Sequence, residues 1–170
     1  IYEALMYMEE KGVRHLAVEN RNGQIVSVID NKALIQFQRY GPIVLAREIA
    51  RAVTAQEVAA CTQRTPPLVK TLLDSSARPR ILTKLLASFC DSATQRLIQL
   101  AIQTLGEPPV EFAFIAMGSQ GRQEQTLLTD QDNGIIYAAV NADQEKNVND
   151  YFLRLGTLVC DGLKQAGYPY

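Results

Sequence analysis

Two spacings of apolar residues alternate along the chain, and they divide it into three stretches. In residues 1–40, apolar positions recur with a helical spacing over 2–12 and again over 31–37. Between these segments, short apolar runs over 14–20 and 24–30 are typical of strands. The NRNG sequence that joins the runs predicts a hairpin turn, because Asn-Gly readily takes the positive φ angles that such turns need.

Residues 41–109 predict an almost wholly helical stretch. Pro42 stands in the first turn of its first helix, where the missing N–H costs nothing. Thr54 and Glu57 then form a capping-box pattern, which predicts the start of a second helix.

The end of this stretch predicts one long helix or two helices in line. Pro66 and Pro67 are expected to break the chain before the apolar segment 68–74. Apolar residues then recur with a helical spacing over 80–105, and Gly106 ends the pattern.

The third stretch, residues 110–170, predicts strands followed by a helix. The run 110–118 has apolar residues on both faces, which favours a strand buried in a mixed sheet. A second strand is predicted over 129–137 and a helix over 150–167. Together the three stretches indicate an α+β fold.

Composition excludes several classes of function. The chain has 17 basic and 18 acidic residues, which argues against a dedicated nucleic-acid or anionic-membrane surface. No apolar run approaches the roughly 20 residues of a membrane span, so no membrane partner is expected. The three cysteines are widely separated and fit neither a disulfide framework nor a zinc site, which favours a cytoplasmic location.

The candidate chemistry begins at the turn after the strand 110–118. Gly118 allows a sharp turn and close approach of a ligand, and Ser119 offers a hydroxyl and an N–H. Gly121 is a second permissive position. Arg122 supplies a forked cation suited to phosphate oxygens, and a short helix starting there would favour an anion at its N-terminus.

Asp130 and Asp132 lie two residues apart, so on a strand both carboxylates project from the same face. Such neighbours repel each other unless a cation lies between them, and oxygen ligands of this kind suit Mg²⁺ beside a phosphate. The alternative is an ordinary turn beside two solvated aspartates. A glycine turn after a buried strand, combined with an Asp pair at the next strand, favours a phosphate and metal site.

The segment GSQGRQEQTLLTDQDN resembles the signature of the DNA-polymerase-beta-like nucleotidyltransferase superfamily, which is Gly-Ser or Gly-Gly, a gap, and Asp-x-Asp. In detail it is similar to the nucleotidyltransferase family related to the nitrogen-signalling uridylyltransferase. The resemblance extends over essentially the whole chain and is most specific over residues 117–133. It implies Mg²⁺-dependent transfer from a nucleoside triphosphate to a hydroxyl of a regulatory protein or a small molecule.

The resemblance also implies roles for individual residues. Asp130 and Asp132 would be catalytic and would ligate two Mg²⁺ ions. Gln131 departs from the apolar residue usual in the superfamily but fits this subfamily. The implied nucleotide- and phosphate-binding residues are Gly118, Ser119, Gly121, Arg122 and Glu124.

The superfamily usually adds a third carboxylate from a later strand. After the Asp pair, the acidic residues are Asp143, Glu145, Asp150 and Asp161, and none lies on a predicted strand. The chain is therefore expected to be a fragment that binds triphosphate weakly and has no transferase activity by itself. The alternative is a complete protein that has become a catalytically inactive nucleotide-sensing or interaction module in signal transduction.

Residues 1–40 resemble the C-terminal half of a CBS domain. The resemblance lies in the segments MEEKGVRHLAV and IVSVID. This resemblance implies a regulatory module that pairs as a homodimer and binds adenine nucleotides. Where that family holds ribose with an Asp, this chain has Ala33, which cannot accept a hydrogen bond, so packing or dimerisation is the expected role. Residues 41–109 would then be a helical linker and 110–170 the N-terminal part of a nucleotidyltransferase domain.

Overall fold

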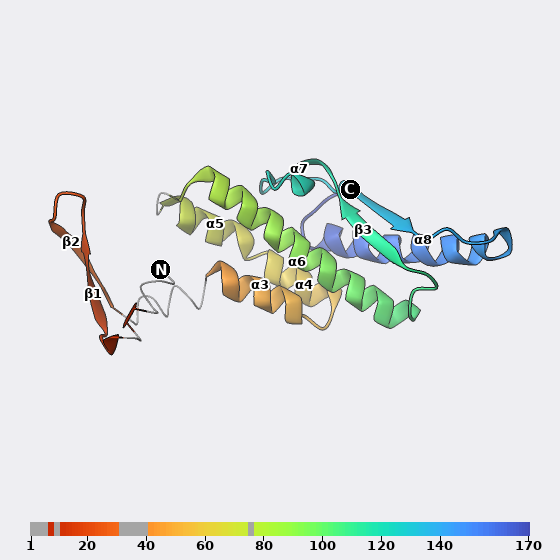
Figure 1. Ribbon diagram of the computed structural model, residues 1–170, viewed down its shortest axis with the longest axis horizontal. Helices are drawn as coiled ribbons and strands as arrows, with labels where there is room; N and C mark the ends of the chain where they lie inside the picture. Colours follow the sequence, from red (N-terminus) through yellow and green to blue (C-terminus); the bar gives the residue numbers. More distant parts are fainter. Residues whose placement is uncertain (1–6, 9–10, 31–40, 75–76) are drawn as a thin grey trace. The chain divides into compact units, whose positions relative to one another are not determined.

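The computed structural model describes residues 7–8, 11–30, 41–74 and 77–170 (Figure 1). The chain is mixed α and β and divides into two units, Ile1–Val44 and Leu45–Tyr170. The predicted helix over 31–37 and Ala33 lie outside the described residues, as does most of the helix predicted over 2–12. None of the helices in the described part is long and apolar enough to cross a membrane.

The first unit contains the predicted hairpin. Strands β1 (His15–Glu19) and β2 (Ile25–Asp30) pair antiparallel, with a register shift between Val18 and Glu19. In the turn, the Asn20 side-chain oxygen accepts from the backbone N–H groups of Asn22 and Gln24, at 2.9 and 3.1 Å. Gly23 has a φ of +79°, as the Asn-Gly sequence predicts.

Helix α3 (Pro42–Arg51) crosses the boundary between the two units. The second unit continues with α4 (Ala55–Thr62), α5 (Thr65–Asp74) and α6 (Pro79–Leu105). The capping box is confirmed, because the Thr54 hydroxyl accepts from the Glu57 N–H at 3.1 Å. The Glu57 carboxylate in turn accepts from the Val53 N–H at 2.8 Å. The stretch 80–105 forms one continuous helix.

The predicted break at the tandem prolines is wrong in position. Pro66 and Pro67 lie in the first turn of α5, and the helices are separated at residues 63–64 instead. The first turn of a helix leaves its N–H groups without intrahelical partners, so proline is tolerated there.

The remaining elements are β3 (Phe112–Ala116), α7 (Gly118–Gly121), β4 (Asn133–Tyr137) and α8 (Ala142–Gln165). β3 and β4 form a two-stranded antiparallel sheet in which Ala116 pairs with Asn133. The described residues therefore contain no mixed sheet of the kind that was predicted. Most of β3 is only half-buried and Ala113 is exposed, since a sheet of two strands leaves much of its surface uncovered.

The core of the second unit lies where α6 packs against α4 and α8 (Figure 1). Phe89 of α6 and Leu155 of α8 are completely buried. A Cβ on Gly162 would lie 2.6 Å from a methyl carbon of Leu97, so glycine at this position allows α8 to approach α6 closely. Phe152 attaches the sheet to α8 by stacking on Tyr137, with 4.7 Å between ring centroids.

Helix α8 begins eight residues earlier than the start predicted at Asp150. The polar segment before that residue is helical because it still places one apolar side chain, Val148, on the buried face. Asp143 and Glu145 lie in the first turn of α8, where negative charge stabilises a helix N-terminus.

Candidate nucleotide and metal site

The corner between β3 and α7 is closed by the segment that carries the two aspartates. The Met117 N–H donates to the Asp132 carbonyl at 2.8 Å, which extends the β3–β4 pairing by one step. Gly118 has a φ of +53°, and a Cβ built on it would lie 1.9 Å from Asp132 Oδ2. A side chain at this position would displace the Asp132 carboxylate, and the left-handed backbone also favours glycine.

Gly121 has a structural role at the same corner. A Cβ on this residue would lie 2.7 Å from the Ala116 carbonyl oxygen at the end of β3. The Gly121 N–H also donates to the Met117 carbonyl at 2.9 Å. Gly121 therefore lets the short helix α7 fold back on its own strand.

The short helix predicted to start at Arg122 is wrong. The helical turn is Gly118–Gly121, and Arg122 follows it. Gln123 has a φ of +57°, in the left-handed region, so a right-handed helix cannot continue through it. The expected anion site at a helix N-terminus after Arg122 is therefore absent from this loop.

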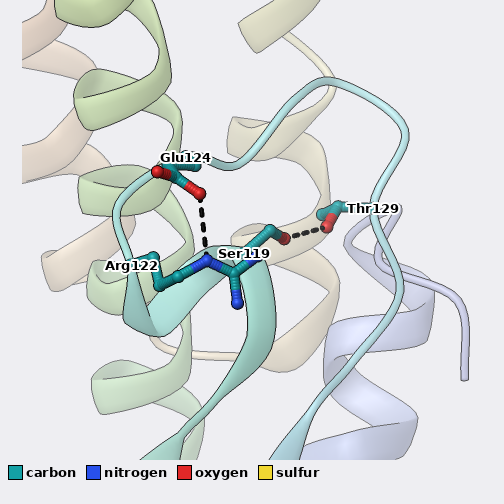
Figure 2. A network of polar contacts seen from close by, with 4 residues as sticks. All are labelled: Ser119, Arg122, Glu124 and Thr129. Atoms are coloured by element: carbon teal, nitrogen blue, oxygen red, sulfur yellow. Dashed lines mark hydrogen bonds and ion pairs between the residues drawn. The ribbon is translucent and has the colours of Figure 1, made fainter.

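Ser119 is held by a residue that the sequence did not single out. The hydroxyls of Ser119 and Thr129 lie 3.0 Å apart and share a hydrogen bond (Figure 2). Thr129 is 9% exposed and immediately precedes Asp130. A threonine directly before the Asp pair was the available signal, but only the fold shows that it reaches back ten residues to Ser119.

Arg122 and Glu124 form an ion pair on the outside of the loop, with 2.9 Å between Nε and Oε2 (Figure 2). Both side chains are about two-thirds exposed, at 64% and 65%. The pair orients the guanidinium relative to Ser119, because the Glu124 N–H donates to the Ser119 carbonyl at 2.8 Å.

Two glutamines of this loop lie against α6, and one of them is hydrogen-bonded to it. The Gln120 side chain donates to Asp91 Oδ1 at 2.9 Å. Gln125 is 1% exposed and lies beside Cys90. Neither amide atom of Gln125 has a hydrogen-bond partner among the described residues. Burial raises the pKa of the Cys90 thiol to about 11. Cys90 is therefore a neutral packing residue at ordinary pH.

A hollow of about 510 Å³ lies over this loop. It brings together three of the predicted site residues, Ser119, Glu124 and Asp130. Gly118, Gly121, Arg122 and Asp132 do not line it. The remaining lining residues are Thr126, Leu128, Thr129 and Pro169. A second hollow of about 530 Å³, between β4 and α8, contains none of the predicted site residues.

Asp130 and Asp132 lie immediately before β4, and both are exposed. Neither carboxylate forms an ion pair with another described residue. The Asp132 carboxylate lies against the Gly118 backbone, and carboxylate oxygens of this kind fit a Mg²⁺ ion that takes its other ligands from phosphate and water.

The protein provides few other metal ligands at this place. Over residues 7–8, 11–30, 41–74 and 77–170, no group of three or more His, Cys, Asp or Glu side chains could hold a metal ion. The later acidic residues Asp143, Glu145, Asp150 and Asp161 all lie on α8, and none lies on a strand.

Comparison with known proteins agrees with these features. Residues 63–170 match the family described as Putative nucleotidyltransferase DUF294. No curated protein and no solved structure gave a significant match. The matched region includes the glycine corner, the Asp pair and α8, and it covers more than half of the chain. The chain therefore belongs to the Putative nucleotidyltransferase DUF294 family.

Proposed function

We propose that the protein uses a nucleoside triphosphate and Mg²⁺ to transfer a nucleotidyl group to a hydroxyl of a protein or small molecule. The observation that carries this proposal is the contact between Gly118 and Asp132. A turn with no side chain and a carboxylate meet there, so phosphate and metal can be held at one point.

Asp130 and Asp132 are the proposed metal ligands. Mg²⁺ bound there would neutralise charge on the triphosphate and polarise the reacting oxygens. The aspartates hold it by supplying two carboxylates that have no cationic partner among the described side chains. Their mutual repulsion makes a cation the favourable ligand.

The triphosphate would lie over the loop between β3 and β4. The backbone at Gly118 allows close approach, and the Ser119 hydroxyl at the hollow can donate to a phosphate oxygen while Thr129 fixes its position. Arg122 supplies positive charge at the outer side of the loop, and Glu124 orients it.

The proposed reaction joins the acceptor hydroxyl oxygen to the α-phosphorus and breaks the bond to the β-phosphate oxygen. Pyrophosphate leaves, and the hydroxyl proton passes to solvent. The residues described here contribute positioning and charge neutralisation rather than a covalent intermediate.

A catalytically inactive nucleotide sensor is the alternative. It is favoured by a specific observation, since no third carboxylate joins the Asp pair in the described residues. Such a protein would bind the Mg²⁺ complex of a triphosphate without releasing pyrophosphate.

We also propose that residues 1–40 are a regulatory module of the CBS type, followed by a helical linker over 41–109 and the transferase region over 110–170. The β1–β2 hairpin supports this, as do Ile25 and Val28, which are 70% and 62% exposed and suit a packing or homodimer surface better than a ligand pocket. The family match begins at residue 63 and does not extend to this region.

The test is calorimetry of the chain with ATP, GTP, CTP and UTP, each with Mg²⁺ and with excess chelator. We expect at least one triphosphate to bind with Mg²⁺ and to lose its binding with chelator. Binding that is equal in both conditions, or no binding at all, would refute the proposed site. A parallel assay for pyrophosphate release separates the transferase from the sensor.

A further inference from the structure

Gln131 lies between the two proposed metal ligands, but its side chain is directed to another element. Its Nε2 donates to the Tyr168 carbonyl at 2.7 Å and to the Cys160 carbonyl at 3.0 Å. Both carbonyls belong to the C-terminal end of α8 and the turn that follows. Its Oε1 accepts from the Asn133 side chain at 3.3 Å.

Glutamine suits this position for a chemical reason. A primary amide has two N–H groups, and here each can meet one carbonyl oxygen. A methionine of similar length would donate to neither carbonyl. A glutamate would place a carboxylate against two carbonyl oxygens, and the like partial charges would repel.

The backbone of the same segment is bonded on both sides. The Gln131 N–H donates to the Pro169 carbonyl at 3.0 Å, whereas the next residue, Asp132, accepts from Met117 through its carbonyl. Bonds from adjacent residues to opposite sides are typical of an extended chain, in which neighbouring side chains alternate. In an extended chain, a Gln131 side chain anchored toward α8 would leave Asp130 and Asp132 on the opposite face.

The hydrogen bonds of Gln131 also shape the hollow of about 510 Å³ over the loop. Pro169 lines it together with Ser119 and Asp130, and the Pro169 carbonyl accepts the hydrogen bond from the Gln131 N–H. The turn after α8 is thus one wall of the proposed site.

We propose that Gln131 is a positioning residue that sets the spacing of the two carboxylates and holds the turn after α8 as a wall of the site. This inference rests on the proposed function, because it assumes that the carboxylates bind a metal. Gln131 itself does not contact metal or nucleotide.

The experiment compares Gln131→Met with Thr62→Val. The Thr62 hydroxyl bonds to the Ala166 carbonyl at 2.8 Å and to the Ala59 carbonyl at 2.9 Å, so its replacement removes a buried hydrogen bond to the C-terminal end of α8. Thr62 is not part of the proposed site. The affinity for Mn²⁺, used as a paramagnetic substitute for Mg²⁺, is measured by electron paramagnetic resonance, and the melting temperature of each variant is measured in parallel.

We expect Gln131→Met to weaken Mn²⁺ binding by about tenfold or more, as replacing residues that orient metal ligands commonly does. Thr62→Val should lower the melting temperature comparably and keep the wild-type Mn²⁺ affinity. Equal affinities for wild type and Gln131→Met would overturn the inference while leaving the proposed function standing, and so would an equal loss in both variants. Absence of Mn²⁺ binding by the wild type would overturn both.

A second measurement needs no variant and covers the case in which Gln131→Met does not fold. In the wild type, titration with Mg²⁺ should shift the NMR signals of the Gln131 side-chain amide together with the backbone signal of Asp132. A Gln131 amide signal that stays fixed while the Asp132 signal moves would contradict the proposed role of Gln131 in positioning the carboxylates.

Discussion

The corner at Gly118 and the turn at Arg122 belong to the same loop, yet different forces hold them. At the corner, the Met117 N–H bonds to the Asp132 carbonyl, and the Asp132 carboxylate lies where a side chain on Gly118 would be. At the turn, Arg122 and Glu124 meet through an ion pair that is largely in water. Exposed pairs of this kind contribute less than about 1 kcal/mol, and salt weakens them further.

The difference separates two kinds of contribution to the proposed site. Residues at the corner determine whether metal and phosphate can be held at all. Residues at the turn adjust the local charge, and substituting them should have only small effects on binding. The following substitutions test that ranking.

The largest effect is expected from Asp132→Asn, and a similar one from Asp130→Asn. Each removes one charge from the proposed metal site and should abolish Mg²⁺-dependent triphosphate binding in calorimetry. The melting temperature of the metal-free protein should not fall, because the two carboxylates repel each other there. Asp150→Asn, on an exposed part of α8, is the control and should bind as the wild type does. A wild-type affinity in Asp132→Asn would show that the metal site is elsewhere.

Gly118→Ala should come next. Its Cβ would collide with the Asp132 carboxylate and would also require a left-handed backbone, at about 1–2 kcal/mol. We expect triphosphate binding to fall by at least about tenfold, since one ligand must move. Gly12→Ala is the control, because Gly12 has a similar positive φ of +64° but its Cβ would meet nothing within 4 Å. If both variants lose stability and both keep binding, the corner does not define the site.

Thr129→Val should have a moderate effect. The substitution keeps the shape of a buried side chain and removes the hydroxyl that holds Ser119. A neutral hydrogen bond is worth about 0.5–1.5 kcal/mol, so triphosphate affinity should fall by up to about tenfold. Thr157→Val, which loses a hydroxyl bond to Leu153 within α8, provides the comparison. Identical binding in Thr129→Val and wild type would remove Thr129 and its bond to Ser119 from the site.

Glu124→Gln should have the smallest effect. The melting temperature should hardly change, and triphosphate affinity should change at most a few-fold, with the difference shrinking as salt is added. Glu48→Gln, which breaks a different exposed ion pair, with Arg64, should leave binding unchanged. A loss as large as that of Asp132→Asn would contradict the distinction between corner and turn.

Several features of this protein follow from sequence because their causes lie within a few residues. The Asn-Gly turn, the capping box at Thr54 and the end of α6 at Gly106 each depend on local backbone chemistry. The same holds for the glycine corner and the Asp pair, whose residue types and spacing indicate phosphate and metal before any fold is known. The roles of these residues as ligands stay predictions.

Other features depend on contacts between residues far apart in the chain, which local patterns do not encode. The start of α8 is earlier than its apolar pattern predicted, and the helical turn after β3 lies at Gly118–Gly121 because Gln123 takes a left-handed conformation. The strand β3 looked fully buried, whereas its two-stranded sheet leaves it half-exposed.

The sequence by itself determined which residues could bind phosphate and metal, because side-chain chemistry and short spacings are local properties. The tertiary structure decided how they are held. It places Asp132 against Gly118, joins Thr129 to Ser119 and directs Gln131 to the end of α8. These pairs are separated by 10 to 37 residues, so they meet only once the strands and helices have packed.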